Sequence, residues 1–239
     1  MTQGFDPCES DRNSCPNNAF QPITTSDVHK IIKSLPSNKA PCCDKVNAKI
    51  LKDSSPVIAP IITSLINNSF TLSTFPLPWK KAEIVPILKS GDSEEPANTR
   101  PISLLLILSK VCERAVHSQF TNFLDSNNVI HHLQSGNRKL HSTESALLHF
   151  TDELLNNMDQ KKISVVVLLD MSKAFDSIRH DLMLRKLRKS GVSEPACAWF
   201  ESYLSQRQQV VKFQNTVSDP LPVTVGVPQG SIMSLVLFT

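Results

Sequence analysis

VVVLLDMSKAFDSI, residues 165–178, carries the clearest structural signal in the chain. Five consecutive apolar residues run into Asp170, and a short polar step then leads to Phe175 and Asp176. Such an apolar run predicts a buried strand over residues 163–169. A carboxylate at the end of a buried strand is held rigidly beside a cleft, which suits it to bind a divalent cation. The alternative for Asp170 is a cap of the following turn, and Asp176 is more typical of a turn residue.

The composition is that of an ordinary globular protein, with 40% hydrophobic and 20% charged residues. No apolar run approaches the ~20 residues that span a bilayer, and the N-terminus lacks the order of a signal peptide. We therefore expect an intracellular protein, nuclear or cytoplasmic, without a membrane segment. The six cysteines match no zinc-ligand spacing and predict reduced, structural thiols. A net charge of +3 neither supports nor excludes a polyanionic partner.

Helical and strand patterns alternate along the chain, which predicts a mixed α and β fold. Residues 1–21 are polar and aperiodic, so we expect a flexible lead-in there. Residues 46–70 read as two helical pieces broken at Pro56 and Pro60. Other helices are expected over residues 24–35, 103–125, 144–160, 180–191 and 194–205, and strands over 83–88 and on both sides of a polar turn within 208–227.

Five blocks resemble, in order, the reverse transcriptase domain of LINE-type (non-LTR) retrotransposons. They are NKAPCCDKVNAKILK (38–52), FPLPWKKAEIVPILKSGDSEEPANTRPISLL (75–105), QSGNRKLHSTESALLH (134–149), LLDMSKAFDSIRHDLMLRKL (168–187) and WFESYLSQRQQVVKFQNTVSDPLPVTVGVPQGSIMSLVLF (199–238). The resemblance runs from about residue 27 to residue 239, and five blocks in family order are not expected by chance.

The resemblance implies an α+β fold of the right-hand polymerase type. Fingers and an incomplete palm, an antiparallel-rich sheet packed with helices, would be present without a thumb. The chain would divide into a flexible segment (1–21), a helical region upstream of the fingers (22–75) and the reverse transcriptase domain (76–239).

The resemblance also implies a metal and nucleotide site around the opening stretch. Asp170 matches the first metal-binding aspartate and so the catalytic carboxylate, and Met171 would add its backbone carbonyl to Mg²⁺ or Mn²⁺. Phe175 matches the aromatic gate under the sugar of the incoming nucleotide, where a bulky ring would collide with a 2′-hydroxyl. Without the family, Phe175 would be interpreted as a core residue. Asp176 matches a frequent family residue that is not a metal ligand.

Four further residues match nucleotide-binding positions of the family. Lys89 and Arg100 match basic fingers positions against the triphosphate, a task that suits the fork of an arginine. Gln229 and Gly230 match the turn near the nascent base pair, where glycine lets the backbone approach closely. Taken alone, both cations are solvated surface charges and the VPQGS stretch is a simple turn.

Arg138 and Lys139 lie in another loop of the resemblance, where they would touch template or triphosphate. The implied function is RNA-directed DNA polymerisation, in which two metals assist nucleotidyl transfer from deoxynucleoside triphosphates to a DNA primer on an RNA template. The family's aromatic-x-Asp-Asp motif does not occur in these 239 residues, so we expect a truncated, inactive chain. The alternatives are a non-catalytic nucleic-acid-binding remnant and a domesticated interaction module. The sequence makes no prediction of oligomeric state.

Several residues depart from the family pattern at expected turns. Leu140 stands where a glycine is usual, and Asn137 replaces a phenylalanine. A non-glycine residue at a tight turn can be forced to a positive φ, at a cost of about 1 kcal/mol. These losses are typical of a decaying copy of a mobile element.

Overall fold

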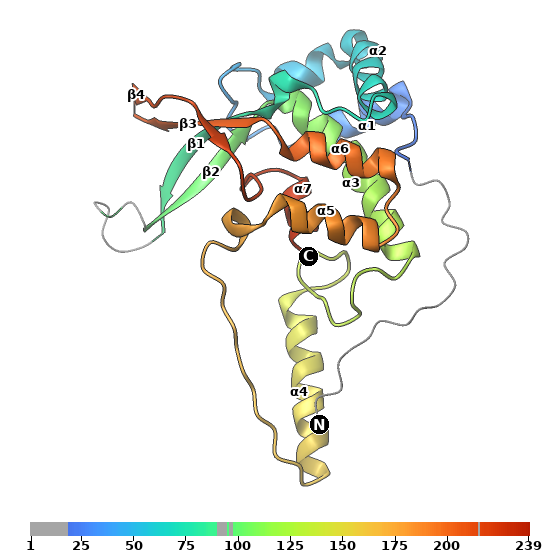
Figure 1. Ribbon diagram of the computed structural model, residues 1–239, viewed down its shortest axis with the longest axis vertical. Helices are drawn as coiled ribbons and strands as arrows, with labels where there is room; N and C mark the ends of the chain where they lie inside the picture. The colour runs from blue at the N-terminus through green and yellow to red at the C-terminus, as the bar shows by residue number, and fades with distance from the viewer. Residues whose placement is uncertain (1–18, 90–94, 96–97, 215) are drawn as a thin grey trace.

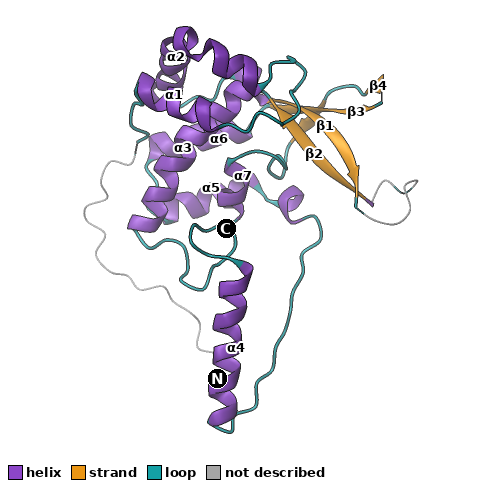
Figure 2. Ribbon diagram, turned by 180° about the vertical axis from the view of Figure 1, so that it is seen from behind, coloured by secondary structure: helices purple, strands orange, loops and turns teal. Residues whose placement is uncertain are grey.

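The computed structural model describes residues 19–89, 95, 98–214 and 216–239, so the expected flexible lead-in lies almost wholly outside the described residues. Helices form one side of the molecule and the strands gather on the other (Figures 1 and 2). The elements run α1 (Thr25–Ser34), α2 (Ala48–Thr71), η1 (Leu77–Lys80), β1 (Lys81–Leu88), β2 (Thr99–Leu105), α3 (Ile107–Ser126), α4 (Thr143–Asp159), η3 (Ala174–Ser177), α5 (His180–Lys189), α6 (Glu194–Leu204), β3 (Arg207–Phe213), β4 (Thr216–Val217), β5 (Leu221–Val223) and α7 (Met233–Phe238).

The second helix corrects the expectation of two pieces, because α2 runs unbroken through Pro56 and Pro60. A proline inside a helix frees the carbonyl four residues earlier from its hydrogen bond. Pro56 and Pro60 are four residues apart and both exposed, so they share the outer face of α2. Water can satisfy the freed carbonyls on that face, and the buried face keeps the helix in place.

Aromatic side chains form the centre of the core. Trp199 and Tyr203 of α6 are fully buried and stack with their ring centroids 5.6 Å apart. Phe75 lies edge-on to both, at 5.4 Å from Trp199 and 5.0 Å from Tyr203. Phe20 packs edge-on against Trp199, so the core includes part of the segment predicted to be flexible. Such edge-on pairs add about 0.5–1.5 kcal/mol each beyond the buried area.

The sheet is mixed and has the order β2-β1-β3-β4, with β5 also paired to β3. β1 and β2 form an antiparallel hairpin that projects from the body, and β1 runs parallel to β3 (Figure 1). The far edge of β3 is shared by β5 and β4, both antiparallel to it. Residues 103–105, expected at the start of a helix, complete β2 instead, because the hairpin pairs them with residues 82–84.

The predicted buried strand over residues 163–169 is wrong. The segment is extended but pairs with no strand among the described residues, and its side chains are exposed, with Leu168 at 90% and Leu169 at 89%. A strand is stabilised by hydrogen bonds and side-chain pairs with neighbouring strands. The apolar run meets no such neighbour here, so its hydrophobicity alone does not create a strand.

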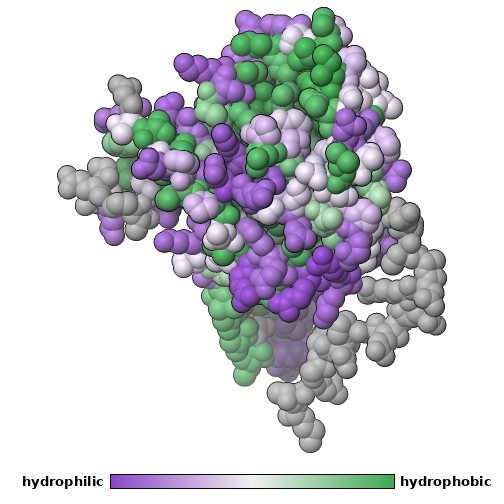
Figure 3. Space-filling view, turned by 45° about the horizontal axis from the view of Figure 1, so that its top comes forward, coloured by the Kyte–Doolittle hydropathy of each residue, from purple (hydrophilic) through white to green (hydrophobic). Residues whose placement is uncertain are grey.

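The helix before this segment forms as predicted, but its side chains are not buried either. Ser142 caps α4 through the capping box with Ser145, yet none of the residues of α4 is buried. We call α4 and residues 160–173 the exposed arm; it extends away from the helical body (Figure 1). Apolar surface is visible on the projecting lower part of the molecule in Figure 3. Within the described part of the chain, no helix is long and apolar enough to cross a membrane.

Candidate functional site

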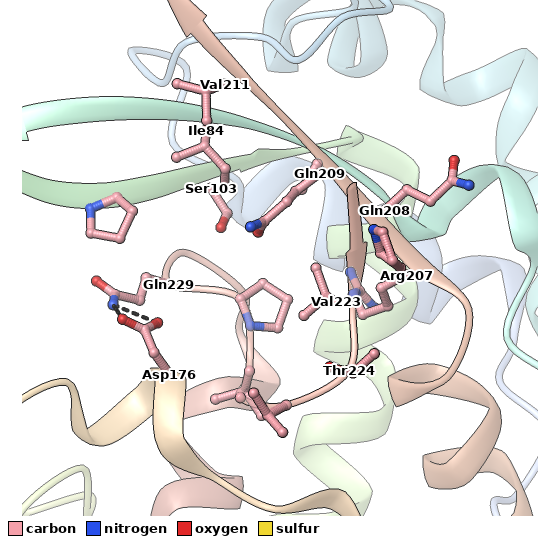
Figure 4. A pocket seen from close by; sticks show the side chains of 17 residues that line it. Ile84, Ser103, Asp176, Arg207, Gln208, Gln209, Val211, Val223, Thr224 and Gln229 are labelled. Atoms are coloured by element: carbon pink, nitrogen blue, oxygen red, sulfur yellow. Dashed lines mark hydrogen bonds between the residues drawn. The ribbon is translucent and has the colours of Figure 1, made fainter. Parts of the chain in front are cut away.

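A cleft of about 380 Å³ separates the sheet from the loop that follows β5 (Figure 4). The loop contributes residues 224–229, and Asp176 of η3 lies at the same opening. The strands contribute Ala82, Ile84, Pro101, Ser103, Arg207, Gln208, Gln209, Val211, Pro222 and Val223. Glutamine residues and one carboxylate therefore line a partly apolar hollow, a mixture that is common in ligand sites.

The turn Pro228–Gly230 is pressed against β2. The Ser103 N–H donates to the Gln229 carbonyl at 2.7 Å. Gly230 has φ +128°, and a β-carbon there would lie 2.6 Å from the carbonyl oxygen of Ser103. Glycine is therefore required, because any side chain would collide with the β2 backbone.

Two backbone hydrogen bonds tie the loop before this turn to η3 and to the residue that follows it. The N–H of Gly226 donates to the Ile178 carbonyl at 2.8 Å, and that of Val227 donates to the Phe175 carbonyl at 2.9 Å. Gly226 has φ +80°, and a β-carbon there would lie 2.8 Å from the Cα of Asp176. The stretch SKAFDSI and the stretch GVPQG, distant in sequence, are thus fixed side by side.

Gln229 and Asp176 meet at the cleft. The Gln229 side-chain amide donates to both carboxylate oxygens of Asp176, at 2.9 and 3.1 Å (Figure 4). The sequence pointed to Gln229 but interpreted Asp176 as structural. Asp176 lies six residues after Asp170 in the same family block, and this position in the sequence was a signal that it belongs to the site.

Phe175 is half-buried and does not line the cleft. Its ring lies 4.8 Å from that of Phe238 in α7, and it packs against the main core. These contacts are those expected if Phe175 is a core residue. Its role as a gate for the nucleotide sugar stays a prediction.

Asp170 and Met171 lie on the exposed arm, outside the cleft lining. Both are solvent-exposed. Among the described residues, no three His, Cys, Asp or Glu side chains are grouped so that they could hold a metal ion. The one carboxylate of Asp170 therefore does not fit a two-metal centre, and we derive no step through a metal. Mg²⁺ or Mn²⁺ ligation by Asp170 and Met171 stays a prediction.

The predicted basic contacts lie outside the cleft lining as well. Lys89 and Arg100 are exposed at the outer end of the β1–β2 hairpin. Arg138 and Lys139 lie in the loop before α4, where Arg138 donates to the His131 carbonyl at 3.4 Å. Their contacts with triphosphate or template stay predictions.

A buried polar cluster behind the cleft was missed from the sequence. Glu113 of α3 is fully buried, and its Oε2 accepts from the Ile232 N–H at 2.7 Å and the Ser231 hydroxyl at 3.0 Å. The Tyr203 and Ser231 hydroxyls are 2.6 Å apart, and Arg207 donates to the Tyr203 carbonyl at 2.8 Å. Tyr203 and Arg207 are four positions apart, but the other hydrogen-bonded pairs of the cluster are separated by 28 or more positions. No local motif therefore reveals the cluster.

Burial dominates the electrostatics of this cluster. It raises the pKa of the Glu113 carboxyl, while the nearby Arg207 guanidinium acts in the opposite direction. Burial also raises the pKa of the Tyr203 hydroxyl, and the neighbouring Glu113 acts in the same direction. Both hydroxyl and carboxyl are therefore biased toward their neutral forms.

Comparison with known proteins shows which proteins this chain is similar to. The family model described as reverse transcriptase (RNA-dependent DNA polymerase) matches residues 87–239. A probable RNA-directed DNA polymerase from transposon BS of Drosophila melanogaster is 35% identical over 92% of this chain and 24% of its own length. Its X-element counterpart in the same species is 32% identical, over 91% of this chain and 24% of its own.

A third relative extends the comparison. The RNA-directed DNA polymerase from mobile element jockey of Drosophila melanogaster is 28% identical over 91% of this chain and 24% of its own length. The chain therefore spans about a quarter of the length of these relatives. The region matched by the family model includes β2, η3 and the turn that bound the cleft.

Proposed function

Because the chain belongs to the reverse transcriptase (RNA-dependent DNA polymerase) family, we propose that it carries part of the substrate-binding surface of an RNA-directed DNA polymerase of a non-LTR retrotransposon. Its partners would be an RNA template, a DNA primer and deoxynucleoside triphosphates. The observation that carries the proposal is the cleft beside the Pro228–Gly230 turn, where the Gln229 amide faces the Asp176 carboxylate.

In this proposal, Gln229 contacts template or nucleotide directly. A primary amide can donate and accept at once, so it can exchange the Asp176 carboxylate for the edge of a base or a sugar hydroxyl. Gly230 lets the turn backbone lie against β2, which would hold Gln229 beside the nascent base pair. Phe175 acts behind this turn as the gate that favours deoxynucleotides.

The hairpin supplies the electrostatic part of the same surface. Lys89 and Arg100 would contact triphosphate or template phosphates, and Arg138 and Lys139 would add to them from the loop before α4. Asp170 and the Met171 carbonyl are proposed as the first ligands of Mg²⁺ in the complete polymerase. Divalent metals belong to the chemistry of the family, and the described residues assign them no further ligand.

Fluorescence anisotropy with a labelled RNA-template/DNA-primer duplex tests the binding surface. We expect binding that weakens with salt, and a Lys89→Ala/Arg100→Ala variant whose salt slope is smaller by about 2, about 1 for each lost phosphate contact. The matched control is Lys33→Ala/Lys186→Ala, which removes two charges from exposed helical positions outside the proposed surface. Equal slopes in the two variants would contradict the hairpin assignment.

The cleft has its own test. Gln229→Ala should weaken duplex binding by about tenfold, because one polar contact to the substrate is lost. Gln160→Ala, which removes the same side chain from the end of α4, should leave binding unchanged. Absence of any binding by the unmodified chain would overturn the proposed function.

Primer extension with Mg²⁺ or Mn²⁺ distinguishes catalysis from binding alone. Extension that Asp170→Ala abolishes would show that this carboxylate is catalytic in the chain as it stands. Duplex binding without extension supports the alternative of a non-catalytic nucleic-acid-binding surface.

A further inference from the structure

We propose that Glu113, Tyr203, Arg207 and Ser231 form a positioning anchor, which fixes the Pro228–Gly230 turn and through it the Gln229 amide. The four residues come from α3, α6, β3 and the loop before α7. All four are buried, and none of them needs to touch a substrate to act. The inference rests on the proposed function for the role of Gln229 itself.

The hydrogen bonds of the anchor converge on Ser231, the residue after the turn. Its hydroxyl donates to Glu113 Oε2 at 3.0 Å. A hydroxyl has one proton, so Tyr203 must be the donor in its 2.6 Å contact with Ser231. Glu113 also accepts from the Ile232 N–H at 2.7 Å, which fixes the backbone immediately after Ser231.

The turn is closed over this fixed point. The Ser231 N–H donates to the Pro228 carbonyl at 3.1 Å, and the Ser234 hydroxyl donates to the same carbonyl at 2.7 Å. Gln229 and Gly230 lie between these two anchored ends, with the Gln229 carbonyl held by Ser103 on β2. A displacement of Ser231 therefore moves the backbone that carries the Gln229 amide.

The polarity of the anchor argues for positioning rather than for stability. Glu113 is 0% exposed and Arg207 2%, and burying such groups is costly even when they are paired. Glu113 Oε1 and Arg207 Nη2 have no hydrogen-bond partner within the described residues, so part of that cost is not offset. A packed apolar cluster would stabilise the fold at least as well, but it would not define the direction of the turn as hydrogen bonds do.

The geometry also makes the anchor tolerant of the protonation state of Glu113. The two contacts to the turn use Oε2, whereas Oε1 is unpaired. A proton on Oε1 would leave both contacts in place. The amide of a Glu113→Gln variant can present its own oxygen to the same two donors, so this variant should retain the turn and Glu113→Ala should not.

Amide hydrogen exchange in the absence of nucleic acid tests the anchor alone. In Glu113→Ala we expect exchange at the Ser103, Gly226 and Val227 amides to be about tenfold faster or more. Ser103 donates to a carbonyl of the loosened turn, and Gly226 and Val227 belong to the loop directly before it. Glu113→Gln should keep wild-type protection. Val28→Ala, a buried truncation in α1, controls for a general loss of stability, which would speed exchange across the core.

The outcomes separate cleanly. Faster exchange confined to the turn and its partners in Glu113→Ala, with rescue in Glu113→Gln, supports the anchor. Wild-type exchange in Glu113→Ala, or the uniform acceleration expected of Val28→Ala, overturns it. These results do not depend on whether the chain binds nucleic acid, so they can be separated from a failure of the proposed function.

Duplex binding then tests whether the anchor acts through Gln229. Glu113→Ala should weaken binding about as much as Gln229→Ala, and the double variant should be no weaker than either, because the two changes remove one contact. Additive losses would show that Glu113 acts by another route and would overturn the positioning role.

Discussion

The Pro228–Gly230 turn and the exposed arm are both stretches that the sequence marks strongly, yet their surroundings are opposite. The turn is short and irregular, and hydrogen bonds hold it and its neighbouring residues to β2, to residues 175–178 and to the anchor. The arm contains a regular helix and the most apolar run in the chain, and its side chains face solvent. A segment of this fold is therefore fixed in place by hydrogen-bond partners from distant parts of the chain more than by its own hydrophobicity.

Gly230→Ala should break the turn with the largest effect. The new β-carbon would lie 2.6 Å from the Ser103 carbonyl oxygen on β2, and the alanine would have to adopt φ +128°. We therefore expect a loss of about 2–4 kcal/mol in the free energy of unfolding. Urea denaturation followed by circular dichroism measures it. Gly136→Ala, in the loop before the arm, is the matched control, because its β-carbon would meet only a side-chain nitrogen at 3.3 Å. Equal losses in both variants would contradict the close contact at the turn.

The sequence was most reliable where an element carries its own signals. The helix expected over residues 144–160 forms as α4, with Ser142 as its cap. The helix expected over residues 180–191 forms as α5, and Gly191 follows it with φ +83°. Local hydrogen bonds and glycine conformation decide such boundaries, so sequence reasoning reaches them.

The sequence failed where the outcome depends on distant partners. The apolar run 163–169 was expected to be a buried strand, because hydrophobicity cannot reveal whether a neighbouring strand exists. Glu113 was not noticed at all, since a lone glutamate in a helix resembles a solvated one until the fold buries it. At the candidate site, Gln229 was identified through family resemblance, whereas the contribution of Asp176 required the structure.

The pH dependence of stability should differ in sign between the two regions. Burial raises the pKa of Glu113, so its folded form holds a proton that the unfolded form has released above about pH 4.5. The stability of the wild type relative to Glu113→Gln should therefore fall as pH rises from 4.5. On the arm, the Ser142 hydrogen bond lowers the pKa of the exposed Glu144, so the stability relative to Glu144→Gln should instead fall as pH decreases through that lowered pKa.

Denaturation curves for the three proteins between pH 3 and pH 8 measure both differences. The Glu113 difference should be the larger one, because solvent screens the charge of the exposed Glu144. A rise with pH in the Glu113 comparison would contradict the dominance of burial over the Arg207 charge.

Leu140→Gly should sharpen the comparison by relieving strain next to the arm. Leu140 has φ +64° and is 94% exposed, so its side chain offers little burial in return for the left-handed backbone. Relief of the left-handed backbone should add about 1 kcal/mol to the free energy of unfolding. The greater freedom of glycine in the unfolded chain reduces this gain. Leu140→Ala keeps the β-carbon and should not produce this gain. A gain of equal size in both variants would assign the effect to removal of an exposed apolar side chain.

Acidic substitutions on the arm should have the smallest effect on folding. Val167 and Leu169 are 73% and 89% exposed, so a Val167→Asp/Leu169→Asp variant removes little buried area and should change the free energy of unfolding by less than about 0.5 kcal/mol. Its solubility in polyethylene glycol precipitation should rise, because the exposed apolar run is interrupted by charge. Val111→Asp, which places the same group in the core on α3, should prevent folding. A loss of more than 2 kcal/mol from the arm substitutions would mean that the run is packed in solution, and the contrast between the turn and the arm would then disappear.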